Sequence, residues 1–157
     1  MDKLFLFTDG SVHPPTRVGF GAFLAIQEND LLSENPVEIK LKRFEGTSST
    51  KLELQALIWA LGECPHHQEK IIVYTDSQNI ISLKRRRKKL EQNNYLNSRG
   101  ELLNNHLLYQ RFYQIMDKLN CEIIKVQGHL PGKEKDRIDK YFSMVDKASR
   151  KALRNNG

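Results

Sequence analysis

The sequence predicts a mixed α/β fold in which a five-stranded sheet is flanked by four helices, all within one domain spanning residues 1–157. Three observations lead to this prediction. Short apolar runs separated by turn residues occupy the first 44 residues, and apolar residues then recur at helical spacing from Leu52. Beyond that helix, strand-like runs alternate with helical segments. An antiparallel meander followed by parallel crossover strands accounts for this order.

The first three strands are expected at residues 3–9, 18–26 and 37–44. The first is rich in Leu and Phe and ends at the turn-forming residues Asp9-Gly10-Ser11. The second contains two glycines, and in the third Val, Ile and Leu alternate with Glu and Lys. Because only short turns separate the three segments, they are expected to form the antiparallel meander.

The remaining elements follow from changes in apolar spacing. Leu52, Ala56, Trp59 and Ala60 recur at helical spacing, and Gly62 is expected to end that helix. The elements expected after it are a buried strand at 70–76, a helix capped by Ser77, a loop at 93–100, a helix at 101–119, a strand at 121–127, a polar loop at 128–137 and an amphipathic helix carrying Ile138, Phe142, Val145 and Ala152.

Positive charge is concentrated in one place. Lys and Arg total 25 against 19 Asp and Glu, and six consecutive basic residues run from Lys84 to Lys89. Such a run is either a solvated helix face without a partner or a surface that binds nucleic-acid phosphates. A membrane surface is disfavoured because no strongly amphipathic, aromatic-rich helix accompanies the run.

Other features of the sequence argue against several classes of protein. Cys64 and Cys121 are far apart and lack the spacing of metal ligands, so we interpret both as ordinary thiols. No apolar run reaches 18 residues, and a strand-like segment follows Met1 almost at once. The sequence therefore predicts neither a membrane span nor a signal peptide, and the expected location is the cytoplasm.

Two aspartates, Asp9 and Asp76, close predicted buried strands. If those strands are parallel neighbours, both acids emerge at the sheet edge where α/β proteins bind ligands. Two carboxylates so placed repel each other unless a cation lies between them, which predicts a divalent metal site. The alternative is that each acid only caps a turn or the next helix. Glu53 has a structural alternative too, because Thr50 to Glu53 matches a capping box.

Six short motifs have an order and spacing that resemble the type 1 ribonuclease H family along nearly the whole chain. They are Thr8-Asp9-Gly10-Ser11, Gly19-Phe20-Gly21-Ala22, Thr50-Lys51-Leu52-Glu53-Leu54, Tyr74-Thr75-Asp76-Ser77-Gln78, Gly128-His129 and Val145-Asp146-Lys147-Ala148. Each string alone is weak evidence, whereas their joint order is specific. The resemblance implies a ribonuclease H-like fold and a metal-dependent endoribonuclease that hydrolyses the RNA strand of an RNA–DNA hybrid.

The resemblance also implies roles for individual residues. Two Mg²⁺ ions, with Mn²⁺ as a substitute, are expected on four carboxylates: Asp9, Glu53, Asp76 and Asp146. Two such ions about 3.5 to 4 Å apart serve both the attacking water and the leaving oxygen. His129 resembles a loop histidine that assists proton transfer. Asp139 lies nearer the usual spacing from that histidine, but the motif around Asp146 favours Asp146 as the fourth ligand.

The expected partner is an RNA–DNA hybrid, and because the sequence does not determine the oligomeric state, a monomer is taken as the default. The basic run lies where longer members of the family grip the DNA strand, and its residues are Lys84, Arg85, Arg86, Arg87, Lys88 and Lys89. Ser48, Ser49 and Gln78 fall at positions that approach the nucleic-acid backbone in the family. The segment 12–17 departs from the glycine-rich pattern of the family in a loop that touches the RNA sugars. Selection of RNA must depend on 2′-hydroxyl contacts and groove shape.

Two other functions remain open at the level of sequence. A transposase, integrase or junction-resolving nuclease uses a similar acidic cluster on the same fold, and fold alone does not decide function. A non-catalytic nucleic-acid-binding module is the second alternative. The complete set of acids and the loop residue His129 favour the hybrid-specific nuclease over both.

Overall fold

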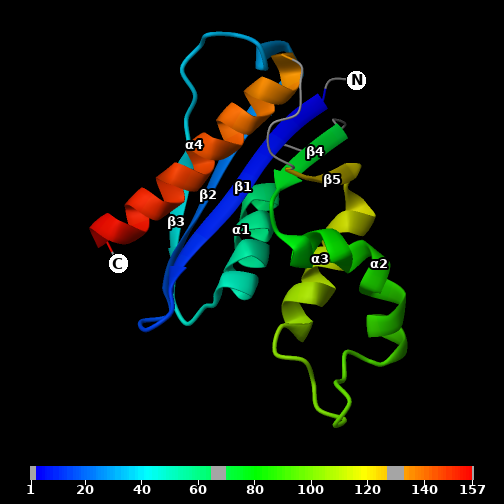
Figure 1. Ribbon diagram of the computed structural model, residues 1–157. Coiled ribbons are helices and arrows are strands. Elements are labelled where there is room, and N and C mark those ends of the chain that lie inside the picture. The colour runs from blue at the N-terminus through cyan, green and yellow to red at the C-terminus, as the bar shows by residue number, and fades with distance from the viewer. Residues whose placement is uncertain (1–2, 65–69, 127–132, 157) are drawn as a thin grey trace.

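The computed structural model describes residues 3–64, 70–126 and 133–156 (Figure 1). Its strands are β1 Lys3–His13, β2 Val18–Gln27, β3 Lys40–Phe44, β4 Lys70–Thr75 and β5 Cys121–Lys125. They form one sheet in the order β3-β2-β1-β4-β5. Strands β1 to β3 are antiparallel neighbours, whereas β4 runs parallel to β1 and β5 runs parallel to β4. The predicted mixed sheet, a meander extended by parallel strands, is confirmed.

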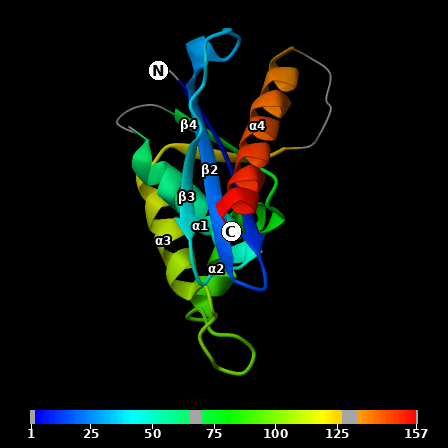
Figure 2. The same cartoon turned by 90° about the vertical axis from the view of Figure 1, so that its left-hand side faces the viewer.

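Helices cover both faces of this sheet. They are α1 Ser49–Glu63, α2 Gln78–Gln92, α3 His106–Lys118 and α4 Lys133–Asn156, with a short 3₁₀ turn, η1, at Glu28–Asp30. Helix α4 crosses one face over β1 and β2, and α1 lies on the opposite face with α3 packed beside it (Figures 1 and 2). The central strand β1 is therefore enclosed by helices on both sides.

The alternation of side chains along β1 divides the interior into two apolar cores. Leu4 and Leu6 face α1 and belong to the core shared with α3, whereas Phe5 and Phe7 face α4. Leu6 and Phe7 are both fully buried. Burial of each such side chain contributes about 1.5 to 3 kcal/mol to folding. Because both faces of β1 are held in this way, the strand is a rigid support for any functional group that it carries.

Several element boundaries differ from the prediction. Strands β4 and β5 end at Thr75 and Lys125, before the predicted ends at 76 and 127. Strand β1 continues past the turn-forming residues to His13, because Gly10 to His13 keep their pairing with β2. Strand β3 begins only at Lys40, since Val37 and Ile39 pack against the core on the α4 side instead of pairing. Gly62 lies inside α1, which ends at Glu63.

Two helix starts also differ. Helix α3 begins at His106, because Leu102 forms an isolated bridge with Leu96 and so belongs to the preceding loop. Residues 133–137 were expected in a polar loop but are helical, as the first turn of α4 that the structure describes. Charged Lys, Glu and Arg side chains favour helices as readily as loops, so polarity alone was misleading there. None of the helices among the described residues is long and apolar enough to cross a membrane.

Candidate active site

The register of the parallel strands brings the first two acids together. Phe7 of β1 lies opposite Tyr74 of β4, so Asp9 and Asp76 each follow this pair by two residues. Asp9 is still within β1, where it pairs with Ala22, and it is 7% exposed. Asp76 comes directly after the end of β4 and is exposed. The parallel arrangement expected from the sequence therefore places a buried and an exposed carboxylate side by side.

Hydrogen bonds fix the turn that carries Asp76. The Ser77 amide donates to Thr75 Oγ1 at 3.1 Å, and the Val126 amide donates to the Thr75 carbonyl at 2.9 Å. Ser77 Oγ accepts from the Ile80 amide at 3.2 Å, which confirms the predicted N-cap of α2. Asp76 thus lies between an ordered strand end and a capped helix.

Glycines in β1 and β2 let helix α1 approach the sheet closely. A Cβ atom on Gly19 would lie 2.6 Å from Leu52 Cδ2, and one on Gly21 would lie 2.9 Å from Ala56 Cβ. A Cβ atom on Gly10 would likewise lie 2.9 Å from Leu52 Cγ. These distances are shorter than van der Waals contact, so larger residues would push α1 outward. The glycines therefore determine how near Glu53, the neighbour of Leu52, comes to β1.

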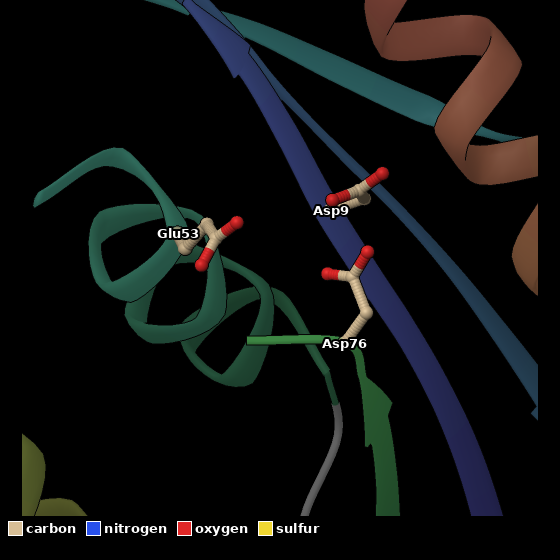
Figure 3. A group of neighbouring side chains, drawn as sticks. All are labelled: Asp9, Glu53 and Asp76. Atoms are coloured by element: carbon tan, nitrogen blue, oxygen red, sulfur yellow. The ribbon is translucent and has the colours of Figure 1, made fainter. Parts of the chain in front are cut away.

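The result is a cluster of three carboxylates from three elements. Asp9, Glu53 and Asp76 each offer an oxygen, and these oxygens all lie within 4.8 Å of one another. Figure 3 shows the three side chains pointing toward a common space between β1, α1 and the end of β4. Carboxylate oxygens at such separations match the hard ligands that Mg²⁺ and Mn²⁺ prefer.

Glu53 does not form the capping box that the sequence allowed. The N-cap of α1 is Ser48, whose hydroxyl accepts from the Lys51 amide at 3.3 Å. The helix therefore starts two residues earlier than a capping box from Thr50 requires, and Glu53 lies beyond its first turn. Its carboxylate instead accepts a hydrogen bond from the Ser77 hydroxyl, across the cluster.

The cluster is short of positive charge. Burial, a hydrogen bond with Asp146 and the negative charge of Asp76 raise the pKa of Asp9 from 3.8 to about 8, although the Gly10 amide opposes the rise. Burial and then the charge of Asp76 raise the pKa of Glu53, against the bond from Ser77. Burial and then Asp146 raise the pKa of Asp76. Carboxylates whose charged forms are all disfavoured are the arrangement that a cation would relieve.

The structure distinguishes between the two aspartates of α4. Asp146 is a hydrogen-bond partner of Asp9, and its Oδ1 atom forms an ion pair with Arg150 Nε at 3.1 Å. Asp139 lies about two turns earlier in the helix, and its Oδ2 atom is buried without a hydrogen-bond partner among the described residues. Of the two acids that the sequence left open, Asp146 is the one beside the cluster.

The basic run divides into two groups on α2. Arg86 donates to Asn79 Oδ1 at 3.0 Å, and its guanidinium lies over the Tyr109 ring. Arg87 makes two bonds to Asp117, at 2.6 and 2.8 Å. These two side chains fasten α2 to α3, so they are not the solvated, unpartnered face that was one alternative, and their role in nucleic-acid binding stays a prediction. The remaining four are exposed: Lys84, Arg85, Lys88 and Lys89.

Three of the other candidate residues lie at the starts of α1 and α2. Ser48 and Ser49 form the exposed start of α1, on the helix that carries Glu53. Gln78 is the first residue of α2 and accepts a hydrogen bond from Lys125 Nζ at 2.8 Å. His129 lies outside the described residues.

Sequence reasoning missed the cations and hydroxyls around the acids. Arg150 and Lys125 both lie close enough to Asp76 to lower its pKa in opposition to the acids. Arg150 stands four residues after Asp146, a helical spacing that would have revealed the pair. Lys125 ends β5, the strand beside β4, and no local pattern in the sequence indicates its partner.

Comparison with known proteins agrees with this geometry. A model of the RNase H family matches residues 1–154. Ribonuclease H of Symbiobacterium thermophilum is 27% identical over 144 residues, which cover 88% of this chain and 91% of the relative. Ribonuclease H of Orientia tsutsugamushi is 27% identical over 157 residues, which cover 96% and 86%.

Solved structures show the same fold. LC9-RNase H1, described as a type 1 RNase H with the type 2 active-site motif, aligns with a TM-score of 0.71 at 15% identity, over 100% of this chain and 74% of that one. A foamy viral protease-reverse transcriptase in complex with RNA/DNA hybrid aligns with a TM-score of 0.69 at 10% identity, over 96% of this chain and 19% of that one. Because the family model covers almost the whole sequence, this chain belongs to the RNase H family of endoribonucleases.

Proposed function

We propose that this endoribonuclease hydrolyses the RNA strand of RNA–DNA hybrids at the carboxylate cluster of Asp9, Glu53 and Asp76, with two Mg²⁺ ions as cofactor. The observation that carries the proposal is the convergence of three oxygens within 4.8 Å, from β1, α1 and the end of β4. Asp146, in hydrogen-bonding contact with Asp9, completes the set of four acids. Mn²⁺ has the same preference for oxygen ligands and is expected to substitute.

The donor set fits divalent cations. All four side chains are carboxylates, and the raised pKa values of Asp9, Glu53 and Asp76 record repulsion and burial that a bound cation would offset. When bound, two such ions supply a nucleophilic water and stabilise the charge that develops on the phosphodiester oxygens. The protein supplies the rigid frame: β1 holds Asp9, the capped turn holds Asp76, and the glycine contact holds α1.

We assign proton transfer to His129, on the basis of its resemblance to the loop histidine of the family. An imidazole titrates near neutral pH, which suits a group that must both take up and release a proton. A pH–rate profile of His129→Ala tests this assignment. The variant is expected to lose turnover while retaining hybrid affinity, and unchanged turnover would refute the role.

Substrate binding is assigned to the start of α1 and to α2. Four exposed cations of α2 are proposed to contact the phosphates of the hybrid: Lys84, Arg85, Lys88 and Lys89. Ser48, Ser49 and Gln78 are proposed to approach the backbone near the cleaved bond. The choice of an RNA–DNA hybrid as substrate rests on the relatives named ribonuclease H; the foamy viral protein of similar fold was solved with an RNA/DNA hybrid and also with double-stranded DNA. We further propose that the enzyme acts as a monomer.

Cleavage of a labelled RNA–DNA hybrid tests the proposed function directly. We expect the RNA strand alone to be cut in Mg²⁺ or Mn²⁺, with no cutting when a chelator is present and none of double-stranded RNA or DNA. Cutting of duplex DNA or four-way junctions would favour the transposase-like or resolvase-like alternative. Salt-sensitive hybrid binding without any cleavage would favour the non-catalytic module.

Paired substitutions test the metal ligands. Asp9→Asn and Asp76→Asn are expected to abolish cleavage in a folded protein. On α4, Asp146→Asn should reduce cleavage strongly, whereas Asp139→Asn is its matched control, since Asp139 lies about two turns away on the same helix. If Asp139→Asn inactivated the enzyme while Asp146→Asn did not, the assignment of the fourth ligand would be wrong.

A further inference from the structure

A buried serine interrupts the apolar face of α4. The face that packs on the sheet includes Phe142, Val145 and Ala152, yet Ser149 between them is fully buried at 0% exposure. A buried hydroxyl costs free energy unless it is hydrogen-bonded. Ser149 therefore needs partners, and both of its partners lie beside the carboxylate cluster.

The two hydrogen bonds of Ser149 form a directed chain. Its hydroxyl donates to the backbone carbonyl of Asp146 at 3.0 Å, and its oxygen lies 2.9 Å from Ser11 Oγ. A serine hydroxyl carries a single proton. Since Ser149 uses its proton on the Asp146 carbonyl, Ser11 must be the donor in the contact between the two hydroxyls. The chain thus runs from β1 through Ser149 to the backbone of Asp146.

Ser11 connects these hydrogen bonds to the strand that carries Asp9. It lies two residues after Asp9 on β1, and alternate residues of a strand face the same side. Phe5 and Phe7 face α4, so Asp9 and Ser11 face α4 as well. The Ser11–Ser149 contact therefore joins the strand segment that carries Asp9 to the helical turn that carries Asp146.

We propose that the Ser11–Ser149 hydroxyl pair positions Asp146 against Asp9, and thereby sets the geometry of the metal site. Neither serine is placed on the metal or the substrate; both act through the backbone of their neighbours. This inference rests on the proposed metal site. It also accounts for the polar residue in α4, where an alanine would fill the same space but could not hold the helix to Ser11.

Magnesium affinity measured by isothermal titration calorimetry tests the positioning role. Ser149→Ala is expected to weaken Mg²⁺ binding by about tenfold, the lower end of losses seen when groups that orient metal ligands are removed. In steady-state cleavage kcat should fall, while KM for the hybrid stays unchanged. Ser11→Ala should show the same changes, and the double variant should be little worse than either single one. Ser11→Thr, which keeps a hydroxyl, should restore Mg²⁺ affinity.

Ser82→Ala is the matched control. Ser82 Oγ donates to the Asn79 carbonyl at 2.8 Å, the same bond to the residue three positions earlier, but in α2. It should lose similar stability and keep full Mg²⁺ affinity. If Ser149→Ala and Ser11→Ala also kept full affinity and kcat, the hydroxyls would only stabilise packing and the inference would be wrong. If the unmodified protein bound no Mg²⁺, the proposed metal site itself would fail, and this inference with it.

Discussion

Replacing Asp9 by asparagine should inactivate the enzyme and yet stabilise its metal-free form at alkaline pH. Burial, the bond with Asp146 and the charge of Asp76 raise the pKa of Asp9 from 3.8 to about 8. A carboxyl whose pKa is higher in the folded than in the unfolded state stabilises the fold only while it is protonated. This contribution is complete below about pH 4 and is lost as the pH rises through about 8.

The size of the effect follows from the shift. Each unit corresponds to about 1.4 kcal/mol, so ionising Asp9 in the metal-free fold costs on the order of 5 kcal/mol. That is a large share of the roughly 5 to 15 kcal/mol that stabilises an ordinary domain. An asparagine side chain has nearly the same shape as aspartate and never ionises. Asp9→Asn should therefore raise the melting temperature at pH 8, by about 2 to 4 °C for every kcal/mol recovered.

Thermal unfolding followed by circular dichroism in a chelator, at intervals from pH 5 to 8.5, provides the measurement. The advantage of Asp9→Asn should grow with pH, and added Mg²⁺ should stabilise the unmodified protein while leaving the variant unaffected. Asp30→Asn, an exposed acid in η1, serves as the control and should show no such trend. A variant that melts at or below the unmodified protein at pH 8 would refute the electrostatic argument.

Four further predictions concern the frame and the binding surface. Gly19→Ala, whose Cβ would lie 2.6 Å from Leu52, should destabilise the fold by about 1 to 3 kcal/mol in chemical denaturation and weaken Mg²⁺ binding by displacing α1. Gly62→Ala, with nothing near the new methyl group, should instead stabilise it by about 0.5 to 1 kcal/mol; a loss there would contradict the packing argument. Replacing Lys84, Arg85, Lys88 and Lys89 by alanine should weaken hybrid binding and reduce its salt dependence without lowering the melting temperature, as fluorescence anisotropy at several salt concentrations would show. Arg87→Ala should lower the melting temperature and leave hybrid binding unchanged, because Arg87 bonds to Asp117. A loss of binding with an unchanged melting temperature would place Arg87 on the nucleic-acid surface.

The sequence predicted those features of the molecule that depend on residues close together in the chain. Apolar runs located the strands, and an acid at the end of each of two runs correctly located Asp9 in β1 and Asp76 directly after β4, the strand parallel to β1. The basic run was visible in the sequence as well, but its separation into packed and exposed side chains was not. Arg86 and Arg87 are held by Asn79, Tyr109 and Asp117, and only the packing of α2 on α3 brings most of these partners near.

Glu53 shows why local patterns can mislead. The string from Thr50 to Glu53 satisfies a capping box, but Ser48 takes the cap and the helix starts earlier. What places Glu53 is a contact between α1 and the glycines of β1 and β2, which joins segments that are distant in the sequence. A glycine in a strand pattern signals a close approach without naming the partner.

The architecture of the site follows from a conflict between function and stability. Acids at this cluster repel one another and resist ionisation, so the metal-free fold must hold them together against their own electrostatics. Arg150 and Lys125 reduce the repulsion from outside the cluster, while the two serines hold β1 and α4 in register. A site designed only for stability would replace Asp9 by a neutral residue. Asp9 lies buried among other acids at this electrostatic cost, and a bound divalent cation would offset that cost.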